Sequence, residues 1–238
     1  MSAPAQTKAG ATAESVAERG LLGAVPWAGV LAGWALAFGA GAGLGYLFIG
    51  LGWWQDGAAW ERNMLVWAHG TVSPLLDPIF LWLPFFGTNY TIAPATAFAA
   101  GYLWYRGLKT ITLHLVVIQL GSWILNPALK FLLMRPRPEL FEQRGQHAFP
   151  AYPSGHSITV SAVLFTIAWI IHRTGHGTWG YWVVGVIFVL NSYSRVYLSV
   201  HWPTDLIGGT VVGVVWLATG LWTFGRFYPA RTSQPAGT

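Results

Sequence analysis

The chain has 238 residues, of which 54% are hydrophobic and only 9% are charged, and its mean hydropathy is +0.47. A soluble domain carries about a quarter charged residues, so this composition excludes an ordinary soluble protein and favours a polytopic membrane protein. The net charge of +5 comes without a basic run with interleaved polar residues, which excludes a typical nucleic-acid-binding surface. The absence of cysteine excludes disulfides, thiolate chemistry and cysteine metal sites.

The two ends of the chain differ from its middle. Residues 1–25 are rich in Ala, Gly, Ser and Thr, which predicts a disordered cytosolic tail. The apolar run that follows is longer than the roughly 7–15 residues of a signal-peptide core, so we expect an uncleaved first membrane span. Residues 26–226 are predicted to form one six-helix membrane domain, and 227–238 a C-terminal tail.

An all-α fold is predicted, because six apolar segments reach the roughly 17–25 residues that a helix needs to cross a bilayer. The first contains Gly29, Gly33, Gly41 and Gly45, spaced at multiples of four residues. Such a stripe either lets a neighbouring helix approach closely or reflects only the frequency of glycine in membrane helices. The six predicted spans are 27–51, 88–105, 110–130, 156–173, 179–199 and 204–225.

The segment between the first two spans, 52–87, has a different character. It carries Trp53, Trp54, Trp60 and Trp67 among several charged residues, and tryptophan prefers the membrane–water boundary. Its last part, 75–86, is apolar but too short to cross a bilayer and contains two prolines. We therefore expect an interfacial or re-entrant segment here.

The basic residues predict the orientation of the chain. With the N-terminus inside, seven Lys and Arg lie on the inner side and six on the outer side. Three of the outer six, Lys130, Arg137 and Arg195, belong to the candidate site described below, and setting them aside leaves seven against three. The positive-inside rule then favours cytoplasmic termini in a bacterial-type inner membrane, with the site on the outer, periplasmic face.

Three polar clusters stand at the ends of the predicted spans. The loops after the third and fifth spans must share one side of the membrane, so the clusters meet at one face whichever way the protein points. Ionisable groups next to lipid are costly and are by default functional. The clusters are Lys130 to Pro138, Pro153 to His156 and Ser194 to Asp205.

The basic members of these clusters predict an anion site. Lys130, Arg137 and Arg195 bring three positive charges to one face. Arginine matches phosphate oxygens with its planar fork, and lysine adds a point charge. A phosphoryl group in transfer spreads negative charge over three oxygens, which such cations stabilise. For each residue taken alone, a basic side chain that merely reaches from a helix end to the interface remains an alternative.

The cluster before the fourth span combines a helix start with a histidine. Ser154 can cap the helix, whose unpaired N–H groups bind anions, and Gly155 permits close backbone approach to a ligand. A histidine titrates near neutral pH, so His156 is a candidate general acid for the leaving group. An ordinary N-cap is the simpler alternative for Ser154 and Gly155.

The last cluster pairs His201 with Asp205 at a spacing of four residues, which can place both side chains on one helix face. A carboxylate behind an imidazole fixes its tautomer and leaves the other ring nitrogen to attack phosphorus. A pair that only ties the start of a helix is the alternative. Two histidines and an aspartate could also ligate zinc, but the nearby cations would repel it, so we expect no metal and no other cofactor.

Together the clusters resemble the three-part signature of the type-2 phosphatidic acid phosphatase family, which vanadium haloperoxidases and glucose-6-phosphatase share. The resemblance extends from Lys130 to Asp205, and residues 1–129 match only in general layout. The matching positions are Lys130-x6-Arg137-Pro138, Pro153-Ser154-Gly155-His156 and Ser194-Arg195-x5-His201-x3-Asp205.

The resemblance implies a six-helix integral membrane phosphatase that needs no metal. His201 would be the nucleophile and form a phosphohistidine, Asp205 would orient and stabilise it, and His156 would protonate the leaving group and later activate water. Lys130, Arg137, Arg195, Ser154 and the Gly155 amide would hold the phosphate, with Ser194, Pro138 and Pro153 in support. The register of Arg135 does not fit the signature, so we expect it only to line the entrance.

The expected function is hydrolysis of a phosphate monoester or diphosphate of a lipid at the level of the head groups. Undecaprenyl diphosphate, phosphatidylglycerol phosphate, phosphatidic acid and lipid A phosphates are the candidate substrates that the family resemblance suggests. A lipid phosphotransferase that uses the same phosphohistidine is an alternative, and so is a non-catalytic binder or transporter of anionic lipids. The sequence gives no indication of the oligomeric state.

Overall fold

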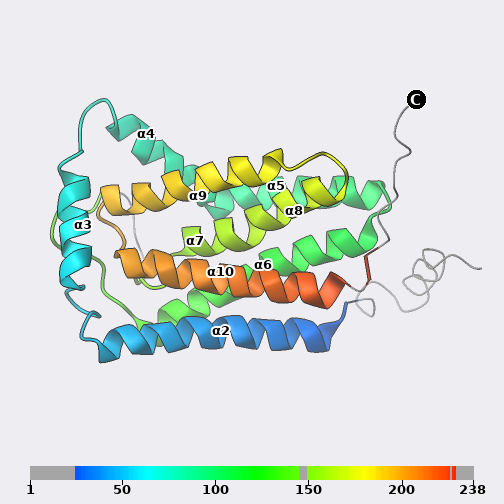
Figure 1. Ribbon diagram of the computed structural model, residues 1–238, viewed down its shortest axis with the longest axis horizontal. Helices are drawn as coiled ribbons and strands as arrows, with labels where there is room; N and C mark the ends of the chain where they lie inside the picture. Colours follow the sequence, from blue (N-terminus) through cyan, green and yellow to red (C-terminus); the bar gives the residue numbers. More distant parts are fainter. Residues whose placement is uncertain (1–24, 145–148, 226, 229–238) are drawn as a thin grey trace, which may run out of the picture.

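A computed structural model of the protein describes residues 25–144, 149–225 and 227–228. The predicted N-terminal tail lies outside the described residues except for Val25, as does the predicted C-terminal tail except for its first two residues. The described part is helical and contains no strand, and its long helices run side by side (Figure 1). They are α2 (Trp27–Gly50), α5 (Asn89–Tyr105), α6 (Lys109–Leu133), α9 (Trp179–Tyr197), α10 (Pro203–Gly225) and a continuous run of α7 (Gly155–Thr159), the π-helical η2 (Val160–Leu164) and α8 (Phe165–Arg173).

All six predicted spans are helical, with ends within three residues of the predicted bounds. Four helices of the described chain are long and apolar enough to cross a membrane, namely α2, α6, the run α7–α8 and α10. The other two long helices are not among these four. Helix α5 is short, with 17 residues, and α9 is more polar, because it carries Asn191, Ser194 and Arg195 in its last two turns. Helix α6 extends three residues beyond the predicted end of the third span, to Leu133, so Lys130 lies within its last turn.

The glycine stripe of the first span serves helix packing. A Cβ atom added at Gly29 would lie 2.6 Å from Thr223 Cγ2, and one at Gly33 would lie 2.6 Å from Thr219 Oγ1. Both threonines belong to α10. The small residues therefore let α2 and α10 approach closely, as GxxxG-type packing does in membranes.

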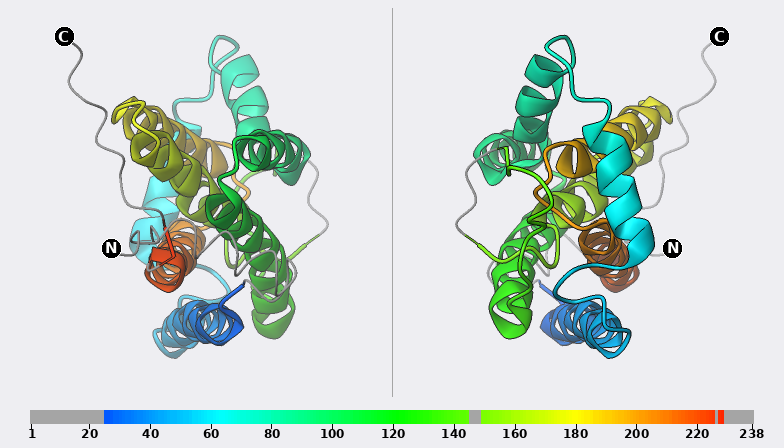
Figure 2. Two further views of the ribbon diagram at one scale, coloured as in Figure 1. Left: turned by 90° about the vertical axis from the view of Figure 1, so that its right-hand side faces the viewer. Right: turned by 90° about the vertical axis from the view of Figure 1, so that its left-hand side faces the viewer.

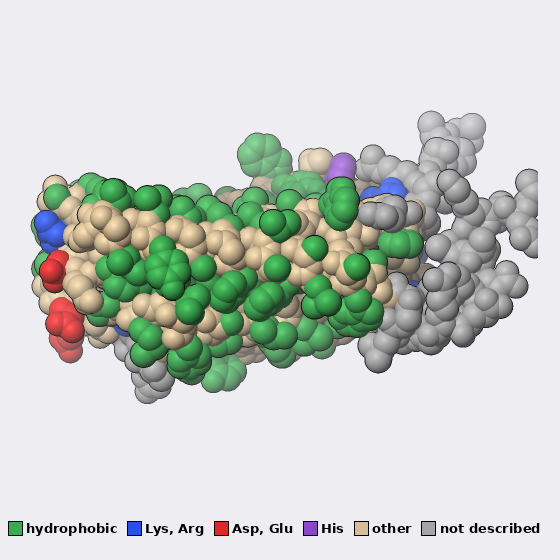
Figure 3. Space-filling model, turned by 90° about the horizontal axis from the view of Figure 1, so that it is seen from below, with side chains coloured by type: hydrophobic (Ala, Val, Ile, Leu, Met, Phe, Trp, Pro, Cys, Tyr) green, Lys and Arg blue, Asp and Glu red, His purple; other side chains and the backbone are tan. Residues whose placement is uncertain are grey.

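The outer surface of the bundle is apolar. Figure 3 shows hydrophobic side chains covering the middle of one face, with acidic and basic side chains only toward its ends. A soluble protein rarely exposes an apolar surface of this extent, whereas a helix bundle in lipid must. Exposed large side chains occur on several of the long helices, for example Leu31, Phe98, Trp182 and Trp222.

The segment that joins α2 to α5 contains three short helices: α3 (Ala59–His69), α4 (Asp77–Trp82) and η1 (Leu83–Gly87). Helix α3 runs crosswise over one end of the bundle (Figures 1 and 2, right). It packs through Leu65 and Ala68 against Val196 and Trp202 of the α9–α10 region. This segment therefore covers the end at which α6 and α9 finish and α7 and α10 begin.

Two residues in the left-handed conformation shape this end. Met134, with φ 50°, terminates α6, and Ser199, with φ 54°, lies in the turn between α9 and α10. Residues other than glycine adopt this conformation at a cost and occur so most often near functional sites. Arg135 follows the first of them directly, and His201 lies two residues after the second.

Candidate active site

The three predicted clusters meet at the end that α3 covers. The first comes from the end of α6 and the chain after it, the second from the start of α7, and the third from the end of α9 and the start of α10 (Figure 1). Arg137 of the first cluster donates to the Val200 carbonyl of the third, and the Ser154 N–H of the second donates to the Asp205 carbonyl of the third at 2.9 Å. The predicted convergence of the clusters is thus present in the structure.

His201 and Asp205 form the predicted pair at the start of α10. The Nδ1 atom of His201 lies 3.2 Å from Oδ2 of Asp205, and the Asp205 side chain is fully buried. The same carboxylate oxygen accepts a hydrogen bond of 2.8 Å from the Trp202 backbone N–H. A carboxylate held in this way fixes the orientation of the imidazole and directs its Nε2 edge away from the carboxylate.

Arg135 contradicts the expectation that it lines the entrance. Its side chain is completely buried, and Nη1 donates a 2.7 Å hydrogen bond to Oδ1 of Asp205. Nη2 lies 3.5 Å from Oε2 of Glu61, which is also fully buried. The expectation rested on the signature register, which takes account of substrate contacts and not of the side chains behind them.

Lys130 and Arg137 lie at the site, and the charged groups of both donate hydrogen bonds to backbone carbonyls. Lys130 Nζ donates to the carbonyls of Pro150 and, at 3.2 Å, Ala151. Arg137 donates through Nε to the Phe149 carbonyl at 3.1 Å and through Nη1 to the Val200 carbonyl. The latter contact places the guanidinium beside the residue that precedes His201.

The electrostatic balance of these groups is positive. Burial lowers the pKa of the Arg137 guanidinium below its ordinary value, while the Asp205 carboxylate acts in the opposite direction. Within the described ranges, Lys130, Arg137 and Arg195 form no ion pair with a carboxylate, whereas Arg135 forms two. The site therefore has an excess of buried and half-buried cations, which an anion can neutralise.

The start of α7 has the predicted cap. Ser154 accepts a 3.5 Å hydrogen bond from the Ser157 N–H through its side chain, and its own N–H donates to the Asp205 carbonyl at 2.9 Å. A Cβ atom at Gly155 would lie 2.7 Å from Asn126 Nδ2. A larger residue here would displace the Asn126 amide of α6, so glycine permits this close contact in addition to any approach to a ligand.

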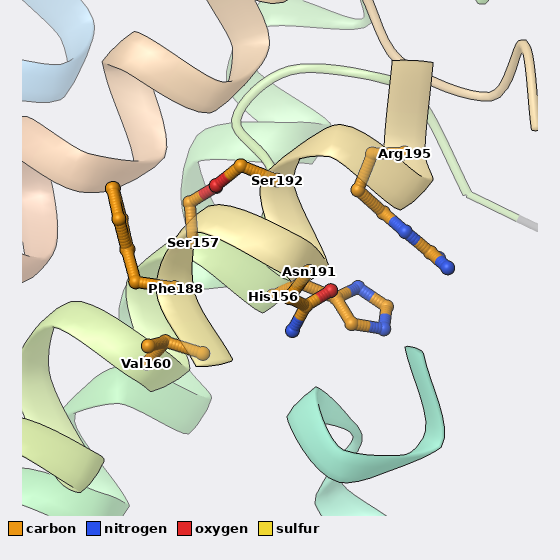
Figure 4. A pocket seen from close by; sticks show the side chains of 7 residues that line it. All are labelled: His156, Ser157, Val160, Phe188, Asn191, Ser192 and Arg195. Atoms are coloured by element: carbon orange, nitrogen blue, oxygen red, sulfur yellow. The ribbon is translucent and has the colours of Figure 1, made fainter. Parts of the chain in front are cut away.

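His156 and Arg195 line a narrow cleft between the α7–η2 run and α9. Figure 4 shows the His156 ring beside the Asn191 amide, with the Arg195 side chain extending from the next turn of α9. The cleft is too narrow to hold a water molecule, and it continues from these polar groups to Val160 and Phe188. Nε2 of His156 and Nη2 of Arg195 are buried and have no hydrogen-bond partner in the described part of the protein.

The supporting residues of the signature lie around these groups. Ser194 donates a 2.6 Å hydrogen bond to the Asn191 carbonyl and accepts one of 3.3 Å from Arg195 Nε, so it orients the guanidinium. Pro153 is buried directly before the cap residue of α7. Pro138 is buried as well, and its carbonyl accepts a hydrogen bond from Gln143.

Sequence reasoning missed several residues that the structure places at the site. Arg135 could have been noticed in the sequence, because Arg135-Pro136 repeats the arginine–proline pair of the signature directly before Arg137. Glu61 is far from the clusters in sequence, and its segment was interpreted as surface. Nothing in the sequence separates Asn191 from other polar residues of membrane helices.

Comparison with known proteins adds the following. The family model described as the PAP2 superfamily matches residues 111–229. An undecaprenyl-diphosphatase of Sulfolobus acidocaldarius is 31% identical over 144 residues, which are 58% of this chain and 66% of that protein. Phosphatidylglycerophosphatase B of Bacillus subtilis is 32% identical over 150 residues, which are 60% of this chain and 72% of that protein.

Among solved structures, the crystal structure of a transmembrane PAP2-type phosphatidylglycerolphosphate phosphatase from Bacillus subtilis is similar to this chain. The TM-score is 0.66 at 26% sequence identity, and the match covers 72% of this chain and 87% of the other. The helical arrangement described above is therefore that of a known membrane fold.

Proposed function

Because the chain belongs to the PAP2 superfamily, we propose that it is an integral membrane phosphatase that hydrolyses a phosphate monoester or diphosphate of a lipid. One observation carries the proposal. Lys130 and Arg195, which are buried, and Arg137, which is half-buried, have no carboxylate partner among the described residues, and they lie in the same region as two histidines, one of which is backed by a buried aspartate. This is the arrangement that transfer of a phosphoryl group requires, because the transition state is stabilised mainly by position and charge.

In the first step, His201 attacks the phosphorus atom through Nε2, and the bond from phosphorus to the leaving oxygen breaks. Asp205 stabilises the positive charge that develops on the imidazole. Lys130, Arg137 and Arg195 hold the non-bridging oxygens, and His156 delivers a proton to the leaving oxygen. The products of this step are a phosphohistidine and the dephosphorylated lipid, which is a lipid monophosphate when the substrate is a diphosphate.

In the second step, His156 takes a proton from water, and the resulting nucleophile attacks the phosphohistidine. The bond between phosphorus and nitrogen breaks, which releases inorganic phosphate and regenerates His201. Lys130 and Arg137 can serve in both steps, since their backbone contacts fix the side chains and leave further N–H groups for phosphate oxygens.

The apolar outer surface of the bundle supports a lipid substrate. His156 and Arg195 form the polar end of the cleft between α7–η2 and α9, and Val160 and Phe188 form its other end. Because Val160 is buried and the cleft has no room for a chain, an acyl or prenyl chain would lie against the apolar side chains on the outside of the bundle. The relatives named above act on undecaprenyl diphosphate and on phosphatidylglycerol phosphate, and both are candidate substrates together with phosphatidic acid and lipid A phosphates.

For the membrane arrangement we propose six spans, with α5 and α9 crossing beside the four more apolar helices and α3 lying in the interface. Cytoplasmic termini would put the active site on the periplasmic side of the inner membrane. The chain has no cysteine, so single cysteines can be introduced for labelling. A cysteine at Gln143 should react with a membrane-impermeant reagent in intact cells, and one at Gly175, at the other end of the bundle, should not.

Phosphate release by purified protein tests the activity. Detergent-solubilised protein should release inorganic phosphate from at least one of these lipids without an acceptor. The rate should survive EDTA and fall with vanadate, which mimics pentacoordinate phosphorus. Transfer only in the presence of an acceptor lipid would indicate a phosphotransferase. Activity that EDTA abolishes and magnesium restores would contradict the metal-free mechanism.

A further inference from the structure

Arg135 is the most completely occupied side chain near the site. Nη1 donates to Thr204 Oγ1 at 2.6 Å and to Asp205 Oδ1 at 2.7 Å. Nη2 donates to the Trp53 carbonyl at 2.7 Å, and Nε donates to the Trp54 carbonyl at 3.2 Å. With the ion pair to Glu61, all five N–H groups of the guanidinium face a partner. Arg135 therefore has no donor left for a phosphate, unlike the neighbouring Arg137.

Glu61 connects the cross-lying helix α3 to the start of α10. Its Oε1 accepts hydrogen bonds from the Thr204 hydroxyl at 2.6 Å and the Thr204 N–H at 3.0 Å. Its Oε2 accepts a 2.8 Å hydrogen bond from the Ala58 N–H and faces Arg135. A fully buried carboxylate is costly unless it is satisfied in this way, so Glu61 and Arg135 require each other.

The result for Asp205 is that its two oxygens have separate partners. Oδ1 accepts from Arg135, while Oδ2 accepts from the Trp202 N–H and faces His201 Nδ1. Rotation of the carboxylate would break the Arg135 contact. The arginine thus fixes which oxygen faces the imidazole, and hence the direction in which Nε2 points.

We propose that Arg135 and Glu61 are positioning residues for the Asp205–His201 pair, connected through Thr204. Glu61 orients Arg135, Arg135 orients Asp205, and Asp205 orients the nucleophile. The inference rests on the proposed phosphatase activity and assigns to it two residues outside the family signature. The cross-lying helix α3 then has a role in catalysis although none of its side chains touches the substrate.

The test uses Arg135→Lys and Glu61→Gln in the full-length protein. Arg135→Lys keeps the charge but loses the fork that spans Thr204 and Asp205. We expect kcat to fall by about 10- to 100-fold, the range for residues that orient a reactive group from behind, while KM changes little. Arg62→Gln is the matched control, because Arg62 also joins α3 to the preceding segment, through the Asp56 and Gly57 carbonyls, without contact to this network.

A second experiment separates positioning from general damage. In an Asp205→Asn background, Arg135→Lys should lower kcat by less than about 2-fold further, because residues that act as a unit are not additive. If either single variant does not fold, Arg135→Gln combined with Glu61→Gln removes one charge of each sign and should restore folding while kcat stays low.

Each outcome decides the question. Full kcat in Arg135→Lys, equal losses in the two backgrounds, or an equal loss in Arg62→Gln would overturn the inference and leave the proposed function intact. Wild-type protein that releases no phosphate from any of the lipids would overturn the proposed function, and this inference with it.

Discussion

The two ends of the bundle each bury a histidine in very different surroundings. At the site end, His201 faces the Asp205 carboxylate. Arg135 pairs with this carboxylate and also with the carboxylate of Glu61. At the other end, His114 of α6 is fully buried, with Nδ1 2.6 Å from the Tyr228 hydroxyl and its ring stacked on Phe224 at 5.0 Å. Burial raises the pKa of the Tyr228 hydroxyl, so this partner stays neutral. We infer that a charged partner, more than burial, distinguishes His201, the proposed nucleophile, from the packed His114.

The first prediction sets these two histidines against each other. His201→Ala should lower phosphate release on the order of 10⁴-fold or more, because loss of a nucleophile removes the whole covalent route. His114→Phe should keep the rate close to wild type and lower the thermal midpoint slightly, since it removes one hydrogen bond worth ~1 kcal/mol. Both variants are measured by phosphate release and by thermal unfolding in the same detergent.

Lipid binding provides the control for this pair. His201→Ala should still bind the substrate, because the three cations remain in place. A comparable loss of turnover in His114→Phe would show that the distinction between the two ends is wrong, and so would an active His201→Ala.

Asp205→Asn removes the negative charge of the residue that faces His201 and keeps its shape. The amide cannot stabilise a cationic imidazole, so kcat should fall by roughly 10³- to 10⁴-fold, by comparison with the same change in a catalytic triad. KM should change much less, since Asp205 does not face the phosphate in the proposed mechanism. Equal losses in substrate binding and turnover would indicate that Asp205 is only structural.

The sequence predicted the layout of the long helices well and the surroundings of the site only in part. Runs of apolar residues define helices in lipid, where each backbone polar group must be satisfied within the helix, so all six segments could be located. Lys130, Arg137, His156 and the Asp205 pair could be found because their spacing is short and regular. The residues of each cluster lie close together in the sequence, so their spacing could be recognised without knowledge of the fold.

The network behind the site could not be predicted, because it depends on how distant segments pack. Glu61 lies 143 residues from Thr204 and reaches it only because α3 crosses the end of the bundle. Tryptophan near Glu61 indicated a membrane surface, and that interpretation gave no reason to bury a carboxylate. The partners of Arg135 likewise come from three separate segments, so the register of the signature, which assigned this residue to the entrance, could not indicate them.

Basic residues at the two ends also differ, and this difference gives the third prediction. Arg195 is buried near His156, whereas Arg106 is exposed and donates to the Tyr102 hydroxyl of its own helix end at 2.6 Å. Arg195→Gln should lower kcat/KM by about 10²- to 10³-fold, as for removal of one donor to a transition-state oxygen. Arg106→Gln should leave kcat/KM unchanged. Similar losses in both would mean that Arg195 acts only through membrane placement.

The smallest expected effect concerns the ion pair between Asp77 and Arg144 at the site end, which is partly exposed, whereas the ion pairs of Arg135 are buried. Asp77 accepts hydrogen bonds from Arg144 at 2.8 Å and from the Tyr197 hydroxyl at 2.6 Å. The hydrogen bond from Arg144, followed by that from Tyr197, lowers the pKa of Asp77 below its ordinary value of 3.8. The ionised carboxylate is therefore favoured in the folded protein, and its contribution to stability is present above that value and disappears as pH falls through the lowered pKa.

Asp77→Asn should accordingly reduce the thermal midpoint by a few degrees at most at pH 6, since exposed pairs contribute little. The difference from wild type should shrink as the pH falls below 3.8 and through the lowered pKa, where the carboxylate of the wild-type protein becomes protonated. The exposed Asp56, changed to Asn, should give no such pH-dependent difference. A loss of phosphate release in Asp77→Asn as large as in Glu61→Gln would contradict the comparison, because it would mean that an exposed pair positions the reactive groups as well as the buried network does.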